Sequence, residues 1–212
     1  MSNLNFENEI WDSKYNNICG IDEVGRGCLA GPVYSGAVVL KKKQNLEDPL
    51  FKKINDSKKL SQNSRESLVQ FIKDISISTA IGICTNDEID DFGIQIAVKT
   101  SMIRAIENLD ITPDFLLIDS LKLDIKIPQK NIIRGDQASK SIAAASIIAK
   151  VARDDFMVTK LSKKFPGYFF DNNKGYGTKV HMEAIKELGI TKSHRKSFEP
   201  IKSIIRKNLW KK

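Results

Sequence analysis

The sequence predicts an α/β fold: a mixed β-sheet flanked by helices, with a small helical region near the C-terminus. Three observations lead to this prediction. Three strand patterns occur within the first 84 residues. Strand and helix patterns then alternate as far as residue 164, which is typical of strands connected by helices. From Pro166 onward the chain is rich in lysine and shows only loop and short-helix patterns.

The N-terminal part of the chain contains the first three expected strands. Residues 1–16 are polar and are expected to form a flexible N-terminal segment. Two apolar runs follow at residues 17–23 and 33–40, with a glycine-rich turn between them and Pro32 before the second run. Residues 75–84 alternate isoleucine or threonine with small or polar residues, which is the period of a half-buried strand.

Helices are expected around the third strand. Residues 41–55 are polar and predict a surface loop, and Ser61 is a good N-cap for a helix that ends near residue 74. A short helical turn over residues 86–92 and a full helix over residues 94–109 come next.

Two more strands and a long helix are expected in the second half of the chain. The strands cover residues 115–119 and 131–133, and the helix spans about 138–164. Apolar positions on this helix follow the i, i+3, i+4 spacing of a core-facing stripe, and small residues at 143–146 favour close packing on the sheet. Three charged side chains elsewhere on the helix are expected to form surface ion pairs: Lys150, Arg153 and Asp154.

Positive charge is concentrated near the C-terminus. The 212-residue chain has a net charge of +8, and residues 179–212 hold ten Lys or Arg against three Asp or Glu. A basic region on a nearly neutral body is typical of nucleic-acid binding. Charge alone is explained equally well by a solvated basic helix without a partner.

Length and composition narrow the class of protein. A single domain over residues 17–212 is expected, with residues 166–212 as its basic helical extension. The three cysteines form no CxxC pair, which indicates reduced thiols rather than disulfides or a zinc site. No run of 18 apolar residues occurs, and the polar N-terminus does not resemble a signal peptide. A monomeric cytoplasmic protein without a membrane partner is expected.

An adjacent pair of acids ends the first strand pattern. Asp22 and Glu23 precede a Gly-Arg-Gly turn at residues 25–27. Mg²⁺ and Mn²⁺ take oxygen ligands, so a carboxylate pair is typical of their sites. Flanking glycines let the backbone approach a ligand while the arginine reaches a phosphate. A metal beside a phosphate indicates phosphodiester chemistry, although an Asp-Glu pair after a strand is also common in plain solvated turns.

Two further acids lie where α/β proteins place their sites. Asp119 ends the strand pattern at 115–119, and Asp136 lies at the start of the long helix, where the helix dipole favours negative charge. If the strands of Asp22 and Asp119 are neighbours, the acids converge and can hold one or two divalent ions. Alternatively, Asp119 begins a turn and Asp136 caps a helix. Adjacent strand residues point to opposite faces, so Asp22 and Glu23 share a metal only if the strand ends or twists there.

An aromatic residue on a glycine-flanked turn is another candidate. Tyr176 lies in the motif Lys-Gly-Tyr-Gly-Thr at residues 174–178. A ring on such a turn in a basic region suits stacking on a sugar or base, although a lone loop tyrosine usually serves packing. His181 and His194 are too far apart in sequence, and too poorly matched with cysteine, to predict zinc.

In this order, these segments resemble those of bacterial ribonuclease HII, the type 2 ribonuclease H. The matching segments are residues 20–27, 29–33, 56–61, 117–119, 135–136, 141–154, 174–178 and 194–200. Type 3 enzymes carry an additional N-terminal domain, whereas 21 residues precede Asp22 in this sequence. One departure is Ser120, which follows the third acid where relatives often have glycine.

The resemblance implies an RNase H-like fold and a catalytic site of four acids: Asp22, Glu23, Asp119 and Asp136. The first three would bind Mn²⁺ or Mg²⁺. It also implies that the protein hydrolyses the RNA strand of RNA–DNA hybrids. A further implied activity is a nick 5′ to a single ribonucleotide in duplex DNA, which leaves 3′-hydroxyl and 5′-phosphate ends.

The resemblance further implies how the substrate is recognised. The backbone of Gly25, Arg26 and Gly27 senses the ribose 2′-hydroxyl, and Tyr176 packs on the neighbouring deoxyribose. The side chains expected to contact phosphates are Arg26, Lys58 and Arg195.

Two other classes stay open from the sequence. Another RNase H-fold nuclease would share the acids but lack the Gly-Arg-Gly and Lys-Gly-Tyr-Gly motifs. A non-catalytic nucleic-acid binder would need the basic region but not four carboxylates, which repel phosphate unless a metal is bound. We find no convincing clamp-binding peptide at the C-terminus, so a sliding-clamp partner is left open.

Overall fold

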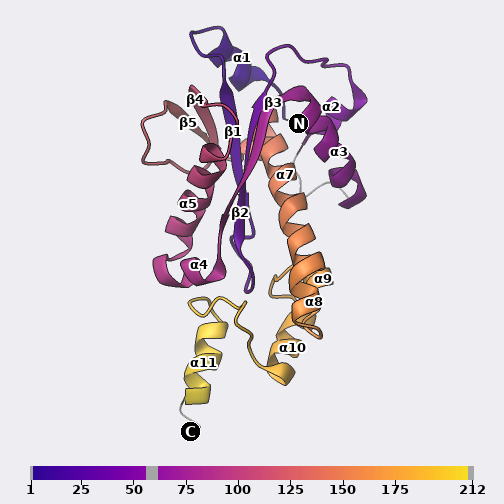
Figure 1. Cartoon of the computed structure of the whole chain (residues 1–212), viewed down its shortest axis with the longest axis vertical. Helices are drawn as coiled ribbons and strands as arrows, with labels where there is room; N and C mark the ends of the chain where they lie inside the picture. The colour runs from indigo at the N-terminus through magenta and orange to yellow at the C-terminus, as the bar shows by residue number, and fades with distance from the viewer. Residues whose placement is uncertain (1, 56–61, 210–212) are drawn as a thin grey trace.

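The computed structural model describes residues 2–55 and 62–209, and its centre is a five-stranded mixed β-sheet (Figure 1). The strands lie in the order β3-β2-β1-β4-β5. β2 is antiparallel to both β1 and β3, whereas β4 is parallel to both β1 and β5. The bounds are β1 Ile18–Val24, β2 Val33–Leu40, β3 Ser76–Cys84, β4 Phe115–Asp119 and β5 Gln129–Ile132. The predicted α/β fold with a mixed sheet is confirmed.

Helices cover both faces of the sheet (Figure 1). α7 (Lys140–Phe156) packs on β1 and β2, with α3 (Gln62–Ile75) beside it. On the other face, α5 (Ile94–Glu107) packs on β2 and β3, next to α4 (Asn86–Phe92). Because strand residues alternate between the two faces, the strands β1, β2 and β4 contribute side chains to two apolar cores. Ile18, Val38 and Leu117 lie in the α7 core, and Cys19, Val39 and Leu116 lie in the α5 core.

Close packing of α7 on the sheet depends on two strand glycines. A Cβ on Gly36 would lie 2.3 Å from the carbonyl oxygen of Ala145, and a Cβ on Gly20 would lie 2.1 Å from the carbonyl carbon of Ser141. The small residues at 143–146 are buried at this contact, as predicted. This approach brings the α7 backbone directly against β1, the strand that carries the first two acids.

The N-terminal segment is folded against the core, so the expectation of a flexible segment over residues 1–16 is wrong. Asn5–Trp11 form α1, and Ile10 is buried. Glu7 is also buried, and its Oε1 accepts a hydrogen bond of 2.5 Å from the Ser139 hydroxyl. This contact fastens α1 to the residue that caps α7.

The long helix expected over residues 138–164 is interrupted twice. α6 (Gly135–Ala138) is separated from α7 by Ser139, whose backbone is extended. After α7 the chain forms a π-helical turn, Met157–Leu161, before α8 (Ser162–Lys164). A π-turn bulges the helix locally, and Met157 there lies against the 29–31 and 174–178 segments.

Two other expectations concern the loop before α3. The predicted loop over residues 41–55 contains a short helix, α2 (Pro49–Lys53), whose N-cap Asp48 accepts hydrogen bonds from two backbone N–H groups. The predicted N-cap at Ser61 lies outside the described residues. Within the described part of the chain, no helix combines the length and apolar character needed to cross a membrane.

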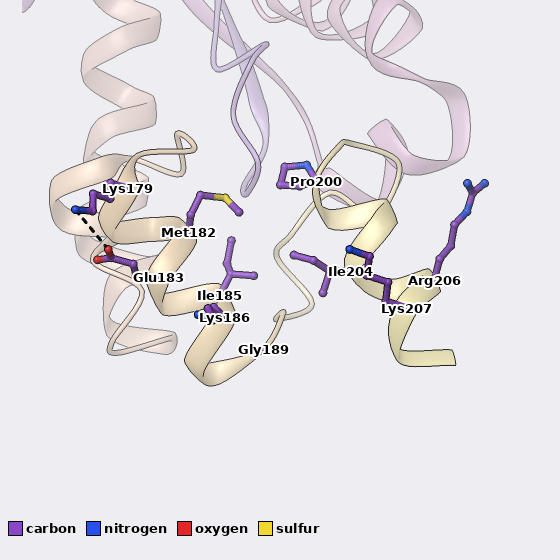
Figure 2. Close-up of a pocket in the computed structure, with 10 residues that line it drawn as sticks. All are labelled: Lys179, Met182, Glu183, Ile185, Lys186, Gly189, Pro200, Ile204, Arg206 and Lys207. Carbon is purple, nitrogen blue, oxygen red and sulfur yellow. Dashed lines mark ion pairs between the residues drawn. The ribbon is translucent and has the colours of Figure 1, made fainter. Parts of the chain in front are cut away.

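The C-terminal region packs short helices around a third apolar core (Figure 1). Their bounds are α9 Phe170–Asn173, α10 Lys179–Leu188 and α11 Ile201–Leu209. Backbone hydrogen bonds join this region to the segment after β1, from Leu29 N to Gly175 O and from Arg195 N to Leu29 O, both 2.8 Å. A groove of about 1040 Å³ lies between α10 and α11 (Figure 2), and none of its lining residues belongs to the acidic site.

Candidate active site

The strands that carry the first and third acids lie side by side. β1 and β4 are parallel, and Ile21 pairs with Ile118 in their register. Asp22 and Asp119 are therefore the next residues on the two strands. The predicted proximity of these strands is confirmed. Both acids lie toward the carboxyl ends of the two strands, beyond the apolar pairs that fix the register.

Asp22 is buried among other charges, with 6 % of its surface exposed. Burial raises its pKa well above the usual value, and the charges of Glu23, Asp119 and Asp136 raise it further. A hydrogen bond from Ser146 on α7 acts in the opposite direction. All four acids therefore lie within one region where their charges repel.

Glu23 follows on β1, and its side chain is 13 % exposed. β1 stays paired with β2 through both acids and ends at Val24, so the strand does not end between Asp22 and Glu23. Burial raises the pKa of Glu23 most, and the charge of Asp119 adds to this rise. Arg26 opposes the rise, since its Nη1 lies 3.6 Å from Glu23 Oε1.

A single oxygen of Asp119 joins β4 to the helix that carries the fourth acid. Asp119 Oδ1 accepts hydrogen bonds from Gly135 N at 2.7 Å and from the Ser120 hydroxyl at 3.1 Å. Gly135 opens α6, where Asp136 is 5 % exposed. Ser120 has φ = 58°, a conformation that favours glycine. Its hydroxyl contact to Asp119 is one that glycine could not make.

The donor set fits a hard divalent cation. Carboxylate oxygens from β1, β4 and α6 are the ligands that Mg²⁺ and Mn²⁺ prefer. Among the described residues, no group of three or more His, Cys, Asp or Glu side chains is arranged to hold a metal ion. Mg²⁺ in phosphoryl-transfer enzymes is usually held by one or two carboxylates together with water and substrate phosphate. One or two carboxylates from these three segments, completed by water and substrate phosphate, would fit that pattern.

The turn after β1 presents two backbone donors. Gly25 has φ = 87°, and a Cβ there would lie 2.1 Å from Arg153 Nε. Arg26 and Gly27 are exposed, and their backbone N–H groups have no acceptor among the described residues. Consecutive free N–H groups on a turn form a concave site for an anion or a lone pair. The Arg26 side chain, 46 % exposed, lies at the same place.

Arg195 lies behind this turn, so the expectation that its side chain contacts phosphate is wrong. It is fully buried. Its guanidinium donates to the carbonyl oxygens of Gly25, Arg26 and Gly31 at 2.7, 2.8 and 3.0 Å. Burial lowers its pKa to about 10, which leaves it charged at neutral pH. Lys58, the other expected phosphate contact of this kind, lies outside the described residues.

The ring of Tyr176 is partly accessible, with 39 % of its surface exposed. Lys150 Nζ lies 5.7 Å and Arg153 Cζ 6.0 Å from the ring centroid. Burial of the hydroxyl raises the phenol pKa to about 12, so the ring is neutral at physiological pH. A neutral ring beside two cations suits contact with a sugar next to a phosphate.

Two buried histidines, which sequence analysis assigned no role, hold the Tyr176 turn. Thr191 N donates to His194 Nδ1 at 2.9 Å, the two Nε2 atoms of His194 and His181 lie 3.1 Å apart, and His181 Nδ1 lies 2.8 Å from Tyr176 O. Since His194 Nδ1 is an acceptor, neutral His194 donates from Nε2 to His181. His181 then donates from Nδ1 to the Tyr176 carbonyl.

The sequence analysis predicted that the charged residues of α7 form ion pairs on the surface, and this prediction is wrong. Lys150 pairs with Asp154 at 2.8 Å, but both side chains are mostly buried. Arg153 is fully buried and donates to backbone carbonyls. Arg153 was not among the predicted stripe positions, but it lies four residues after the stripe residue Ala149, and this i+4 spacing was the available signal for its burial. Arg195 and the histidines offer no such signal, because their partners are distant in sequence.

Known proteins of similar sequence share one family. The family model for ribonuclease HII matches residues 19–201. Ribonuclease HII of Staphylococcus carnosus (strain TM300) is 50 % identical over 203 residues, which cover 96 % of this chain and 76 % of the relative.

Two solved structures of similar fold are those of a ribonuclease H2 and an RNase HII. Ribonuclease H2 from Pyrococcus horikoshii OT3 superposes with a TM-score of 0.73 at 26 % identity, covering 90 % of this chain and 98 % of that one. RNase HII in its PCNA complex from Archaeoglobus fulgidus gives a TM-score of 0.68 at 27 % identity, with coverage of 86 % and 95 %.

Proposed function

This chain belongs to the ribonuclease HII family, and we propose that it cuts duplex DNA on the 5′ side of a single embedded ribonucleotide. Membership makes it an endonuclease of the ribonuclease H class. The proposed products carry 3′-hydroxyl and 5′-phosphate ends, and the RNA strand of longer RNA–DNA hybrids is a second substrate. The observation that carries the proposal is the convergence of four acids beside a turn with two free backbone donors.

The chemistry is proposed to depend on divalent cations, Mg²⁺ or Mn²⁺, held by Asp22, Glu23 and Asp119, with Asp136 completing the site. Such ions, when bound, activate water and stabilise the leaving 3′ oxygen. Ser146 orients the Asp22 carboxylate, and Gly135 N orients Asp119. The described part of the site contains no free histidine to act as a general base, since His181 and His194 are both buried and engaged elsewhere.

Substrate recognition is proposed to use the turn and the tyrosine. The N–H groups of Arg26 and Gly27 would donate hydrogen bonds to the ribose 2′-hydroxyl oxygen, and the Arg26 guanidinium would reach an adjacent phosphate. Tyr176 would pack on the deoxyribose that follows. This division explains how a ribose–deoxyribose junction is distinguished from plain DNA. In the cell, such cleavage in the cytoplasm would serve ribonucleotide excision repair and primer removal.

The test is a DNA duplex with one ribonucleotide, incubated with Mg²⁺ or Mn²⁺ beside an all-DNA duplex. A metal-dependent nick 5′ to the ribonucleotide, absent from plain DNA, is expected. Asp119→Asn should lose nearly all turnover while still binding a hybrid. Retained turnover would overturn the assignment of Asp119. If neither substrate is cut by the wild-type protein, a non-catalytic nucleic-acid binder becomes the better description.

A further inference from the structure

Two fully buried arginines lie behind the loops that the proposed function uses. Arg195 and Arg153 are both 0 % exposed, and neither forms an ion pair with a carboxylate in the described part of the chain. Burying a guanidinium is costly unless its donors are satisfied, and apolar substitutes for buried charges are often neutral or stabilising. Stability alone therefore does not explain why two cations are buried here. The backbone groups that the two arginines contact offer a better explanation.

Arg195 contacts the back of the Gly-Arg-Gly turn. Two of its three acceptors are the carbonyls of Gly25 and Arg26. The Gly25 carbonyl shares a peptide group with Arg26 N–H, and the Arg26 carbonyl shares one with Gly27 N–H. A cation on a carbonyl oxygen polarises its peptide and strengthens the N–H on the other side as a donor. Arg195 thus binds the same two peptides whose N–H groups are free.

Arg153 lies against Gly25 and joins the segment that follows this turn, at Ala30 and Pro32, to the tyrosine loop. Its Nε and Nη2 donate to the carbonyls of Pro32 and Ala30 at 2.9 and 3.3 Å, and its Nη1 donates to Lys174 O at 3.0 Å. Backbone bonds between the same segments, such as Leu29 N to Gly175 O, support this link. The two loops are therefore fixed to each other through one guanidinium, although they are about 150 residues apart in sequence.

We propose that Arg195 and Arg153 are positioning residues for ribose recognition. Arg195 aims and polarises the N–H groups of Arg26 and Gly27, and Arg153 holds the Tyr176 loop at a set distance from them. The proposal rests on the proposed role of both loops in reading the junction. In this proposal the two loops form a rigid template, and their fixed spacing selects a ribose that is followed by a deoxyribose.

The first test is Arg195→Lys. A lysine has one donor nitrogen and cannot span three carbonyls, although it keeps the charge. The control is Arg104→Lys on α5, where a partly exposed arginine donates to Ile83 O at 2.7 Å and pairs with Glu88, away from both loops. Each variant is measured for thermal stability, Mn²⁺ affinity, and dissociation constants for a one-ribonucleotide duplex and an all-DNA duplex in Ca²⁺.

We expect Arg195→Lys to lower the ribonucleotide-to-DNA affinity ratio about tenfold or more, with Mn²⁺ affinity unchanged. Arg104→Lys should lower stability and leave the ratio intact. An unchanged ratio for Arg195→Lys, or equal weakening for both duplexes, would overturn the proposal. Failure of the proposed function itself would be seen separately, as a wild-type protein that neither nicks nor prefers the ribonucleotide.

The wild-type protein offers a second measurement if Arg195→Lys does not fold. In amide ¹H–¹⁵N spectra, the signals of Arg26 and Gly27 should shift on binding the one-ribonucleotide duplex in Ca²⁺ and stay in place with the all-DNA duplex. The Arg195 Nε–H signal should be protected from solvent exchange in both states. If the two amides respond identically to both duplexes, the turn does not read ribose and the proposal fails.

Arg153 is tested by a double-mutant cycle with Tyr176. If Arg153 acts on recognition through the tyrosine loop, Arg153→Lys should slow nicking at the single ribonucleotide in the wild-type background. In a Tyr176→Ala background, Arg153→Lys should not further change the ratio of the nicking rates on the single-ribonucleotide duplex and on a continuous hybrid. Additive losses in the two backgrounds would show a general structural role and reject the positioning role.

Discussion

The Asp22 carboxylate is held where its charge is disfavoured. Burial and the charges of Glu23, Asp119 and Asp136 all raise its pKa, so the ionised form destabilises the folded protein at neutral pH. Asp22→Asn removes this charge while keeping a similar shape and a partner for Ser146. In EDTA at pH 7.5 we expect the variant to be more stable than the wild type by about 1–2 kcal/mol, measured by urea unfolding.

Divalent metal should reverse that order. A cation that binds only the folded wild type adds about 2.7 kcal/mol at 100 times its dissociation constant, whereas Asp22→Asn should gain little from Mn²⁺. The same urea titrations with Mn²⁺ measure both effects. Lower stability of Asp22→Asn in EDTA would show that the four acids do not repel one another in the metal-free protein.

The histidine pair predicts a loss of stability in mild acid. Burial first, and then the charge of His181, lower the pKa of His194 to about 4, from 6.5 in an exposed histidine. Between these values the unfolded chain binds a proton that the folded chain refuses. Stability should therefore fall as pH decreases from 6.5 to about 4, by up to about 3 kcal/mol.

This pH dependence is checked by urea unfolding at several pH values for the wild type and His194→Gln. The variant lacks the titrating group, so its stability should fall less steeply across the same window. Parallel curves would mean that His194 does not remain neutral in the folded protein. The histidine pair also donates a hydrogen bond to the Tyr176 carbonyl. The pH at which the stability of the wild type falls below that of the variant would therefore mark where the Tyr176 turn loses this hydrogen bond.

Individual side chains were predicted well where the strand pattern placed them and poorly where burial decided. Asp22 and Asp119 each end an apolar run, so the sequence located both. Arg195 lies in a lysine-rich segment, and a basic residue there is normally solvated. Its burial arises from backbone carbonyls about 170 residues earlier in the chain, at Gly25 and Arg26, and no local pattern encodes that contact.

We expect the contact between β2 and α7 to affect both the stability of the fold and the position of Asp22. A Cβ at Gly36 would lie 2.3 Å from Ala145 O, and backbone at that distance cannot yield locally. Gly36→Ala should therefore force strand and helix apart and cost about 2–3 kcal/mol. Ser146, the next residue on α7, should move with the helix and weaken its hydrogen bond to Asp22.

Urea unfolding and single-turnover nicking measure the two consequences of Gly36→Ala. Both stability and rate are expected to fall, and excess Mn²⁺ should restore the rate only in part, because the carboxylate itself is displaced. A stable variant with full activity would mean that α7 can shift away from β2 without disturbing the acids.

Elements with a strong repeating pattern were predicted closely, and those stabilised by tertiary contacts were not. β2 and β4 begin and end where their apolar runs do. α1 has seven residues and no side-chain N-cap, too little for a sequence signal, and it is held by packing and by Glu7. The π-turn at Met157–Leu161 has an ordinary helical sequence, so its extra residue per turn depends on contacts with other segments.

The four acids and the two loops of the proposed recognition site come from different layers of the molecule. The acids lie on the sheet and α6, whereas the Tyr176 loop belongs to the C-terminal region, which an isolated bridge between Ala30 and His194 joins to the segment after β1. Most of the excess positive charge lies in that same region. In the proposed complex, the basic region would hold the duplex while the acids act on one phosphate. This arrangement predicts how the affinity for the duplex depends on salt concentration.

Lys192 and Lys196 are exposed and flank the buried Arg195, so they are the basic side chains nearest in sequence to the residue that supports the turn. Each phosphate contact contributes about 0.9 to the slope of log affinity against log salt concentration. Replacing both lysines with glutamine should reduce the slope by up to about 2 and weaken the binding of one-ribonucleotide and all-DNA duplexes equally.

Lys99 and Lys130, which are partly exposed and pair with acids elsewhere, provide the control. Replacing these two lysines should leave the slope unchanged. An unchanged slope for the first pair would mean that these charges only solvate the surface, and that the duplex is held by the turn and the acids alone.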